Sequence, residues 1–149
     1  RDFCLSRGLG DVYKRQVLYY IDHIRKIIKS PMLDLSEYSN TDLKLAYGVG
    51  NFKVLCEYDE NFNHFLLALT NLARACTEAG LYSEAEQTFL LAFHYGSQKM
   101  TDYTSLADVY LHLEEPEKIS ALIRNVEDGS LPHKEALIQA LEQKLMAYR

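Results

Sequence analysis

The sequence predicts an all-α protein whose C-terminal part is a helix–turn–helix solenoid, and three observations lead to this prediction. Apolar residues recur at helical spacing through most of the 149-residue chain. The stretch from Leu66 to His133 repeats its apolar pattern at an offset of 34 residues. Glycine and proline stand mainly where one predicted helix would end and the next would begin. A period of this length is typical of stacked pairs of helices.

The repeat can be followed position by position, because matched residues are apolar in both copies. The pairs are Leu69 and Tyr103, Leu72 and Leu106, Ala73 and Ala107, Cys76 and Tyr110, Ala85 and Ile119, Phe89 and Ile123, and Ala92 and Val126. Within each copy the first four positions fit one helix and the last three fit a second. We therefore expect one repeat at residues 66–99 and another at residues 100–133.

Residues 1–16 are expected to lie outside the natural fold. They include the string CLSRGLGDVYKRQ, which resembles a peptide translated from sequencing-adapter DNA. The segment also shows no helical or strand period. We expect an artefactual or disordered tail here, and a natural chain that continued upstream of Val17.

Residues 17–30 are predicted to form a helix that ends before Pro31, since proline cannot donate a backbone hydrogen bond. Apolar residues recur at helical spacing, at Leu18, Ile21, Ile24 and Ile28. Two early tyrosines followed by basic residues are typical of the cytoplasmic exit of a membrane-spanning helix. The same pattern fits an amphipathic helix that packs on the domain. Both interpretations stay open: a juxtamembrane tether whose upstream half is missing, or a packing helix.

Residues 31–40 contain several turn formers and no sustained period, which predicts a linker. Asn40 or Thr41 is expected to cap the helix that follows. Residues 41–58 fit either a helix broken near its two glycines or a strand that leads into a hairpin. The helical neighbours favour the helix, so we expect a helical domain over residues 41–149.

The later helices begin and end at recognisable signals. A wide apolar face starts near Phe62, and Ala79 and Gly80 are expected to close that helix because glycine adopts the left-handed conformation readily. Helix starts are expected at Tyr82 or Ser83, at Thr101 or Asp102, at Pro116 and at Pro132, with ends at Gly96 and Gly129.

The first repeat resembles the tetratricopeptide repeat family. The residues that carry the resemblance are Leu72, Ala73, Cys76, Ala79, Gly80, Leu81, Tyr82, Ala85, Phe89 and Ala92. Residues 66–99 match the family pattern well, residues 100–133 match it loosely, and residues 134–147 resemble its capping helix. Where the family has a small residue at the helix crossing, the second repeat has Ile119. The resemblance therefore implies a wider or differently angled helix pair there.

The resemblance also implies a function, because the first helix of each family repeat lines a concave groove that holds a partner's peptide or helix. The matching candidate residues in this chain are Thr70, Arg74, Thr77, Thr104, Asp108 and His112. Their hydroxyl and charged groups suit hydrogen bonding to a peptide. A clamp for a C-terminal carboxylate is not expected, since Arg74 is the sole cation on this face and Asp108 would repel the ligand.

Charge argues against a nucleic-acid partner. The formal net charge is −5, and residues 1–16 contribute four basic and two acidic residues, so the remainder carries −7. Residues 57–149 contain fifteen acidic and seven basic residues. Binding to phosphates needs clustered Lys and Arg instead. Cys56 and Cys76 are interpreted as small buried hydrophobes in a reducing, cytoplasmic compartment.

No motif indicates catalysis. The five histidines are scattered, without metal-ligand spacing, at His23, His64, His94, His112 and His133. We therefore expect no enzyme, no metal and no cofactor, but a non-catalytic scaffold that binds a protein or peptide, in the cytoplasm or tethered to the cytoplasmic face of the inner membrane. The alternatives are an accessory or regulatory domain of a larger enzyme or sensor, and a self-assembly module.

Overall fold

The described part of the chain is built entirely from helices. The computed structural model describes the backbone of residues 3–148 and the side chains of residues 11–148. Over this part it contains seven helices and no strand, which confirms the all-α prediction. The helices are α1 (Phe3–Ile27), α2 (Asn40–Tyr47), α3 (Val49–Glu78), α4 (Tyr82–His94), α5 (Met100–His112), α6 (Pro116–Asp128) and α7 (Lys134–Tyr148).

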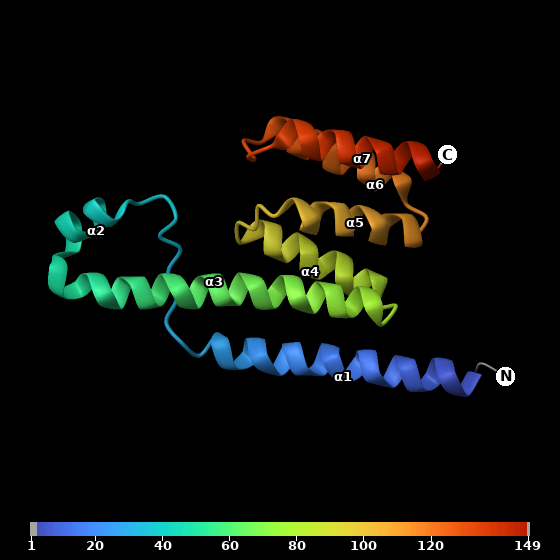
Figure 1. Cartoon of the computed structure of the whole chain (residues 1–149), viewed down its shortest axis with the longest axis horizontal. Helices are drawn as coiled ribbons and strands as arrows, with labels where there is room; N and C mark the ends of the chain where they lie inside the picture. Colours follow the sequence, from blue (N-terminus) through green and yellow to red (C-terminus); the bar gives the residue numbers. More distant parts are fainter. Residues whose placement is uncertain (1–2, 149) are drawn as a thin grey trace.

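The helices stack in layers from α1, at the bottom of Figure 1, to α6 and α7 at the top. α3 packs against α1 on one side and α4 on the other, α4 and α5 are in contact, and α7 packs on both α5 and α6. α1 and α3 run antiparallel (Figure 1). The first half of α3 projects beyond the stack and carries α2.

α1 corrects one expectation. The tail predicted over residues 1–16 is helical from Phe3 onward, as far as the structure describes it. Residues 17–27 supply the nucleus, since Val17 is buried against the core and Tyr20 and Ile21 pack on it. Once a helix is nucleated, each further residue adds one backbone hydrogen bond without needing an apolar period. This conformation leaves the origin of the segment untested.

The interpretation of residues 17–30 as a helix that packs on the domain agrees with the structure. α1 ends at Ile27, before Pro31 as predicted, and its apolar side lies against α3. No helix among the described residues is long and apolar enough to cross a membrane.

The linker is held along α3 by hydrogen bonds. The Leu33 N–H donates to the Tyr58 carbonyl at 3.2 Å, and the Leu35 N–H donates to the Asp59 carboxylate at 3.2 Å. The Asn61 amide donates to the Pro31 carbonyl at 3.0 Å. These contacts give an otherwise irregular segment a defined path over the projecting half of α3.

The predicted cap at Asn40 or Thr41 is wrong, because Ser39 is the N-cap of α2. The Ser39 hydroxyl accepts from the Asp42 N–H at 3.1 Å, and the Asp42 carboxylate accepts from the Ser39 N–H at 3.2 Å. This reciprocal arrangement is a capping box. A Ser at the cap and an Asp three residues later were both visible in the sequence.

Residues 41–58 form a broken helix, and the alternative hairpin is wrong. The break lies at Gly48, whose φ of +84° is a conformation that residues with a Cβ rarely adopt. α3 then continues without interruption to Glu78. It ends in a Schellman motif, in which the Leu81 N–H donates to the Cys76 carbonyl at 2.8 Å and Gly80 has a φ of +76°.

Two helix starts differ from prediction by one or two residues. α5 begins at Met100, slightly before the predicted Thr101 or Asp102. α7 begins at Lys134 instead of Pro132, because His133 takes a positive φ of 57° and interrupts the helical path. The other predicted boundaries, including Pro116 in the first turn of α6, agree with the structure.

The 34-residue pattern identifies the core correctly. Of the fourteen matched residues, all except Leu72 and Tyr103 are buried, and those two pack against the core from its edge. α4 and α6 turn their matched positions inward, with Phe89 and Ile119 fully buried. The helical register of the repeats was therefore readable from the sequence.

Candidate functional site

The six predicted groove residues are divided between α3 and α5, which touch each other. The three threonines direct their hydroxyls back to their own helices: Thr70 to the Leu67 carbonyl at 3.0 Å, Thr77 to the Ala73 carbonyl at 2.9 Å, and Thr104 to the Thr101 carbonyl at 3.1 Å. This geometry is common for threonine within helices.

Thr70 is a correction to the predicted groove, since its side chain is 1% exposed and inaccessible to a partner in this structure. The family pattern assigned Thr70 to the concave groove side of the first helix, where it would face a partner. α5 and the turn before it close over that part of α3, so the position becomes internal.

Asp108 and His112 are exposed but already have neighbours. The Lys144 ammonium donates to the Asp108 carboxylate at 2.8 Å and connects α7 to α5. The His112 ring stacks on Tyr82 with centroids 4.6 Å apart and planes 5° apart. Both residues help join neighbouring helices in addition to facing solvent.

The structure shows a groove along α3 that the sequence did not reveal. A cavity of about 560 Å³ lies between α1 and the C-terminal part of α3. A second cavity shares Tyr19, Tyr20 and Asn71 with the first, and a third shares His64 and Leu67 with the second. The three cavities are therefore neighbours that share lining residues, and the last of them borders the loop between α4 and α5.

We call this row of cavities the α1–α3 groove. From residue 17 onward, it is lined chiefly by Tyr19, Tyr20 and His23 of α1, by His64, Leu67, Asn71, Arg74 and Glu78 of α3, and by Ser97, Gln98 and Lys99 of the loop. Val12, Arg15 and Gln16 also border it, but they belong to the segment expected to lie outside the natural fold. Of the six residues that the resemblance assigned to the concave face, Arg74 lines the first cavity, and the buried Thr70 borders the third.

Aromatic and aliphatic side chains stand open in the α1–α3 groove. Tyr19 is 63% exposed, stacks on His23 at 6.0 Å and meets Tyr20 edge-on at 5.2 Å. Leu67 on the opposite wall is 45% exposed. Tyrosine and arginine are the residue types most enriched where proteins bind one another.

The loop wall of the groove is braced by a buried polar pair. The Ser97 hydroxyl donates to the Asp102 carboxylate at 2.8 Å, and both side chains are buried. A charge-assisted hydrogen bond of this kind holds the loop firmly. The position of Lys99, which follows Ser97 closely, is thereby restricted.

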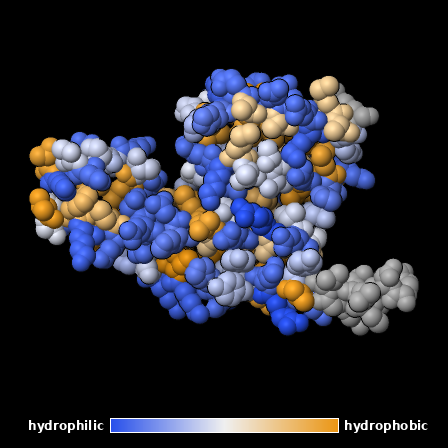
Figure 2. Space-filling view, viewed as in Figure 1, coloured by the Kyte–Doolittle hydropathy of each residue, from blue (hydrophilic) through white to orange (hydrophobic). Residues whose placement is uncertain are grey.

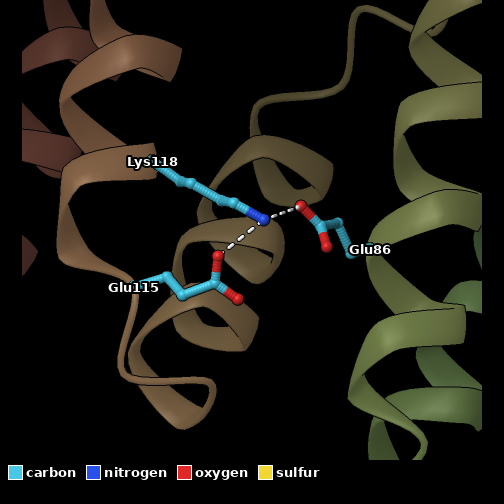
Figure 3. A network of polar contacts seen from close by, with 3 residues as sticks. All are labelled: Glu86, Glu115 and Lys118. Atoms are coloured by element: carbon cyan, nitrogen blue, oxygen red, sulfur yellow. Dashed lines mark hydrogen bonds and ion pairs between the residues drawn. The ribbon is translucent and has the colours of Figure 1, made fainter.

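A second polar cluster lies outside the groove, between α4 and α6. The Lys118 ammonium binds the Glu86 carboxylate at 3.1 Å and the Glu115 carboxylate at 2.6 Å (Figure 3). Hydrogen bonds to the two glutamates raise the pKa of Lys118 above its usual value. Burial, assisted by the charge of Glu86, raises the pKa of the neighbouring Tyr110 to about 12. The cluster connects α6 to α4, and with one ammonium facing two carboxylates it keeps one net negative charge.

Among the described residues, no group of three His, Cys, Asp or Glu side chains is arranged to hold a metal ion. Comparison of the chain with protein-family models, curated proteins and solved structures gave no match. The resemblance to tetratricopeptide repeats therefore rests on the sequence positions quoted above.

Proposed function

We propose that this chain is a non-catalytic protein-interaction module of the tetratricopeptide-repeat type, which binds a segment of a partner protein in the α1–α3 groove. In this proposal α3–α4 and α5–α6 are the two repeats and α7 is the cap. The packing order supports it, since α3 contacts both α4 and α5, and α5 contacts both α6 and α7.

The observation that carries the proposal is the row of neighbouring cavities along α3. Its floor is α3, whose neighbouring residues Ala68, Ala73 and Cys76 are buried in the core. A peptide bound there would meet exposed Tyr19 and Leu67 without any rearrangement of the backbone. Preorganised sites of this kind lose less conformational entropy on binding.

Selection from a random peptide library against the full chain tests the proposal. We expect enriched peptides whose affinity falls at least tenfold in Leu67→Glu, because that change places a charge on the apolar wall. Leu90→Glu is the matched control: Leu90 on α4 is 44% exposed, close to the 45% of Leu67, and lies outside the groove. No enrichment, or equal losses in both variants, would contradict the proposal.

Self-assembly is a second candidate, favoured by the projecting part of the molecule. Leu45 is 81% exposed and Val49 is 74% exposed, and Figure 2 shows apolar side chains gathered on this end. Residues 40–58 contain two acidic and two basic residues, so charge repulsion there is small. Sedimentation should then show a dimer that Leu45→Glu converts to a monomer; a wild-type chain that stays monomeric at high concentration rejects this candidate.

A further inference from the structure

The α1–α3 groove has a net charge opposite in sign to that of residues 57–149. Residues 57–149 contain fifteen acidic and seven basic residues. Yet the groove lining from Tyr19 onward contains the cations Arg74 and Lys99 and a single acidic residue, Glu78. Two of the few basic residues of this acidic region are thus placed in the groove.

These two cations differ from Lys118 and Lys144, although, among the described residues, other basic ones such as Lys53 and Arg124 also have no carboxylate partner. Lys118 is paired with Glu86 and Glu115, and Lys144 is paired with Asp108. Over residues 11–148, neither Arg74 nor Lys99 has a carboxylate within ion-pair distance. Both are exposed, so both are available to a ligand. An arginine fork binds a carboxylate with two parallel hydrogen bonds.

The spacing of the cations limits the ligand. Lys99 lies beside Leu67 and His64 in one cavity, whereas Arg74 lies further along α3 in another. At 1.5 Å per helical residue, that separation is roughly 10–15 Å. An extended chain crosses it in about three to five residues. Between the cations the groove offers Leu67, the Asn71 amide and the Tyr19 ring.

We propose that the α1–α3 groove binds an acidic segment of a partner protein, with carboxylates at Arg74 and Lys99 and an apolar side chain between them over Leu67 and Tyr19. The inference rests on the proposed function and adds the chemistry of the partner. A nucleic acid would also present negative charge, but its long polyanion would meet residues 57–149, where acidic groups outnumber basic ones.

Charge reversal of the groove tests this inference. The full chain and its Arg74→Glu/Lys99→Glu variant are each used to select from a library of random twelve-residue peptides. Wild type should enrich peptides rich in Asp and Glu, and the variant should enrich peptides rich in Lys and Arg. Lys53→Glu/Arg124→Glu is the control, since it changes the net charge equally, and both residues are exposed outside the groove.

A peptide enriched by wild type is then measured by fluorescence polarisation. Its affinity should fall at least tenfold in Arg74→Glu/Lys99→Glu and less than twofold in Lys53→Glu/Arg124→Glu, with unchanged circular dichroism in both. Replacing the Glu and Asp residues of the peptide by Gln and Asn should weaken binding to the wild-type chain by a similar factor. This second measurement needs no protein variant, so it decides the question even if charge reversal disturbs folding.

The results that would contradict the proposed function differ from those that would contradict only the acidic chemistry of the partner. If no peptide is enriched, the proposed function itself fails. If peptides are enriched without acidic bias, or if the bias survives charge reversal, the groove binds proteins but the acidic chemistry is wrong. If a single-stranded oligonucleotide displaces the peptide at equal concentration, the class of partner is wrong.

Discussion

The helix pairs α3–α4 and α5–α6 share one sequence pattern, yet they pack differently. At the crossing position α4 has Ala85 and α6 has Ile119, and both side chains are fully buried. α5 and α6 approach each other along less of their length than α3 and α4 do. A bulky crossing residue therefore kept its burial while the helix pair around it loosened, as the sequence pattern implied.

The second pair depends mainly on contacts with its neighbours, whereas the first pair has both an extensive contact of its own and a neighbour, α1, that packs on α3. α7 packs on both α5 and α6, and Lys118 connects α6 to Glu86 of α4. The first pair has nothing equivalent to Lys118, because the residue 34 positions earlier is Glu84. Two repeats with the same pattern of buried positions can therefore be stabilised by different contacts.

The largest expected difference between the pairs is at the centre of their second helices. Phe89→Ala should lower the unfolding free energy by about 4 kcal/mol, because Phe89 is fully buried and its removal leaves a cavity. The matched change Ile123→Ala should cost about 3 kcal/mol. Chemical denaturation followed by circular dichroism measures both, and an equal or larger loss in Ile123→Ala would reverse the ranking.

The crossing positions should respond next most strongly, and the tighter crossing should lose more stability than the looser one. Ala85→Ile should cost about 2 kcal/mol, since added methyl groups overfill the close α3–α4 contact. Ile119→Val, which trims the looser crossing, should cost about 1 kcal/mol. The same denaturation experiment applies. If Ala85→Ile is neutral, the first crossing has more space than its full burial implies.

Alkaline pH should begin to destabilise the two helix pairs at different pH values. The pKa of Tyr110 is raised to about 12 in the fold from a usual value of 10.0, so the folded state prefers the protonated phenol. Its stabilising contribution is complete below pH 10 and is lost as the pH rises towards 12. Burial also raises the pKa of Cys76 in the first pair above its usual 9.0. The stability that Cys76 contributes should therefore begin to fall at a lower pH than that of Tyr110.

Unfolding free energies measured from pH 8 to pH 12 test this in Tyr110→Phe and Cys76→Ala. Tyr110→Phe should flatten the decline above pH 10, and Cys76→Ala should flatten it from pH 9. Identical profiles in wild type and both variants would show that neither group is coupled to folding.

The smallest expected effect concerns the ion pairs that connect the second pair to the first. Lys118→Met should lower the melting temperature slightly in dilute buffer, and the loss should shrink in 1 M salt because ions screen the pairing with Glu86 and Glu115. Lys26→Met is the control, since its pairing with Asp22 lies on the exposed side of α1. A loss independent of salt would point to packing of the lysine stem instead.

Signals within a few residues predicted much of this fold. Helical periodicity identified the buried faces of the repeats, and the Gly80 and Pro116 signals placed the ends of α3 and the start of α6. The capping box at Ser39 was missed although both residues of its pattern were present. Such features depend on hydrogen bonds between near neighbours, so one sequence is sufficient to read them.

The candidate site was far less readable. Arg74 was identified from the resemblance, but the involvement of Lys99, Tyr19 and Asn71 depends on bringing α1 and the α4–α5 loop beside α3. The burial of Thr70 has the same origin. A basic loop residue such as Lys99 has no local property that distinguishes it from an ordinary solvated lysine.

The sequence by itself determined the helices of the two repeats and which side of each is buried, because hydrogen bonds and apolar periodicity act over a few residues. Only the tertiary structure decided that α1 runs beside α3, that the two helix pairs differ in closeness, and that Arg74 lines the same cavity as Tyr19 and Tyr20. Those outcomes depend on packing between residues that are far apart in the chain, and a local sequence pattern does not predict that packing.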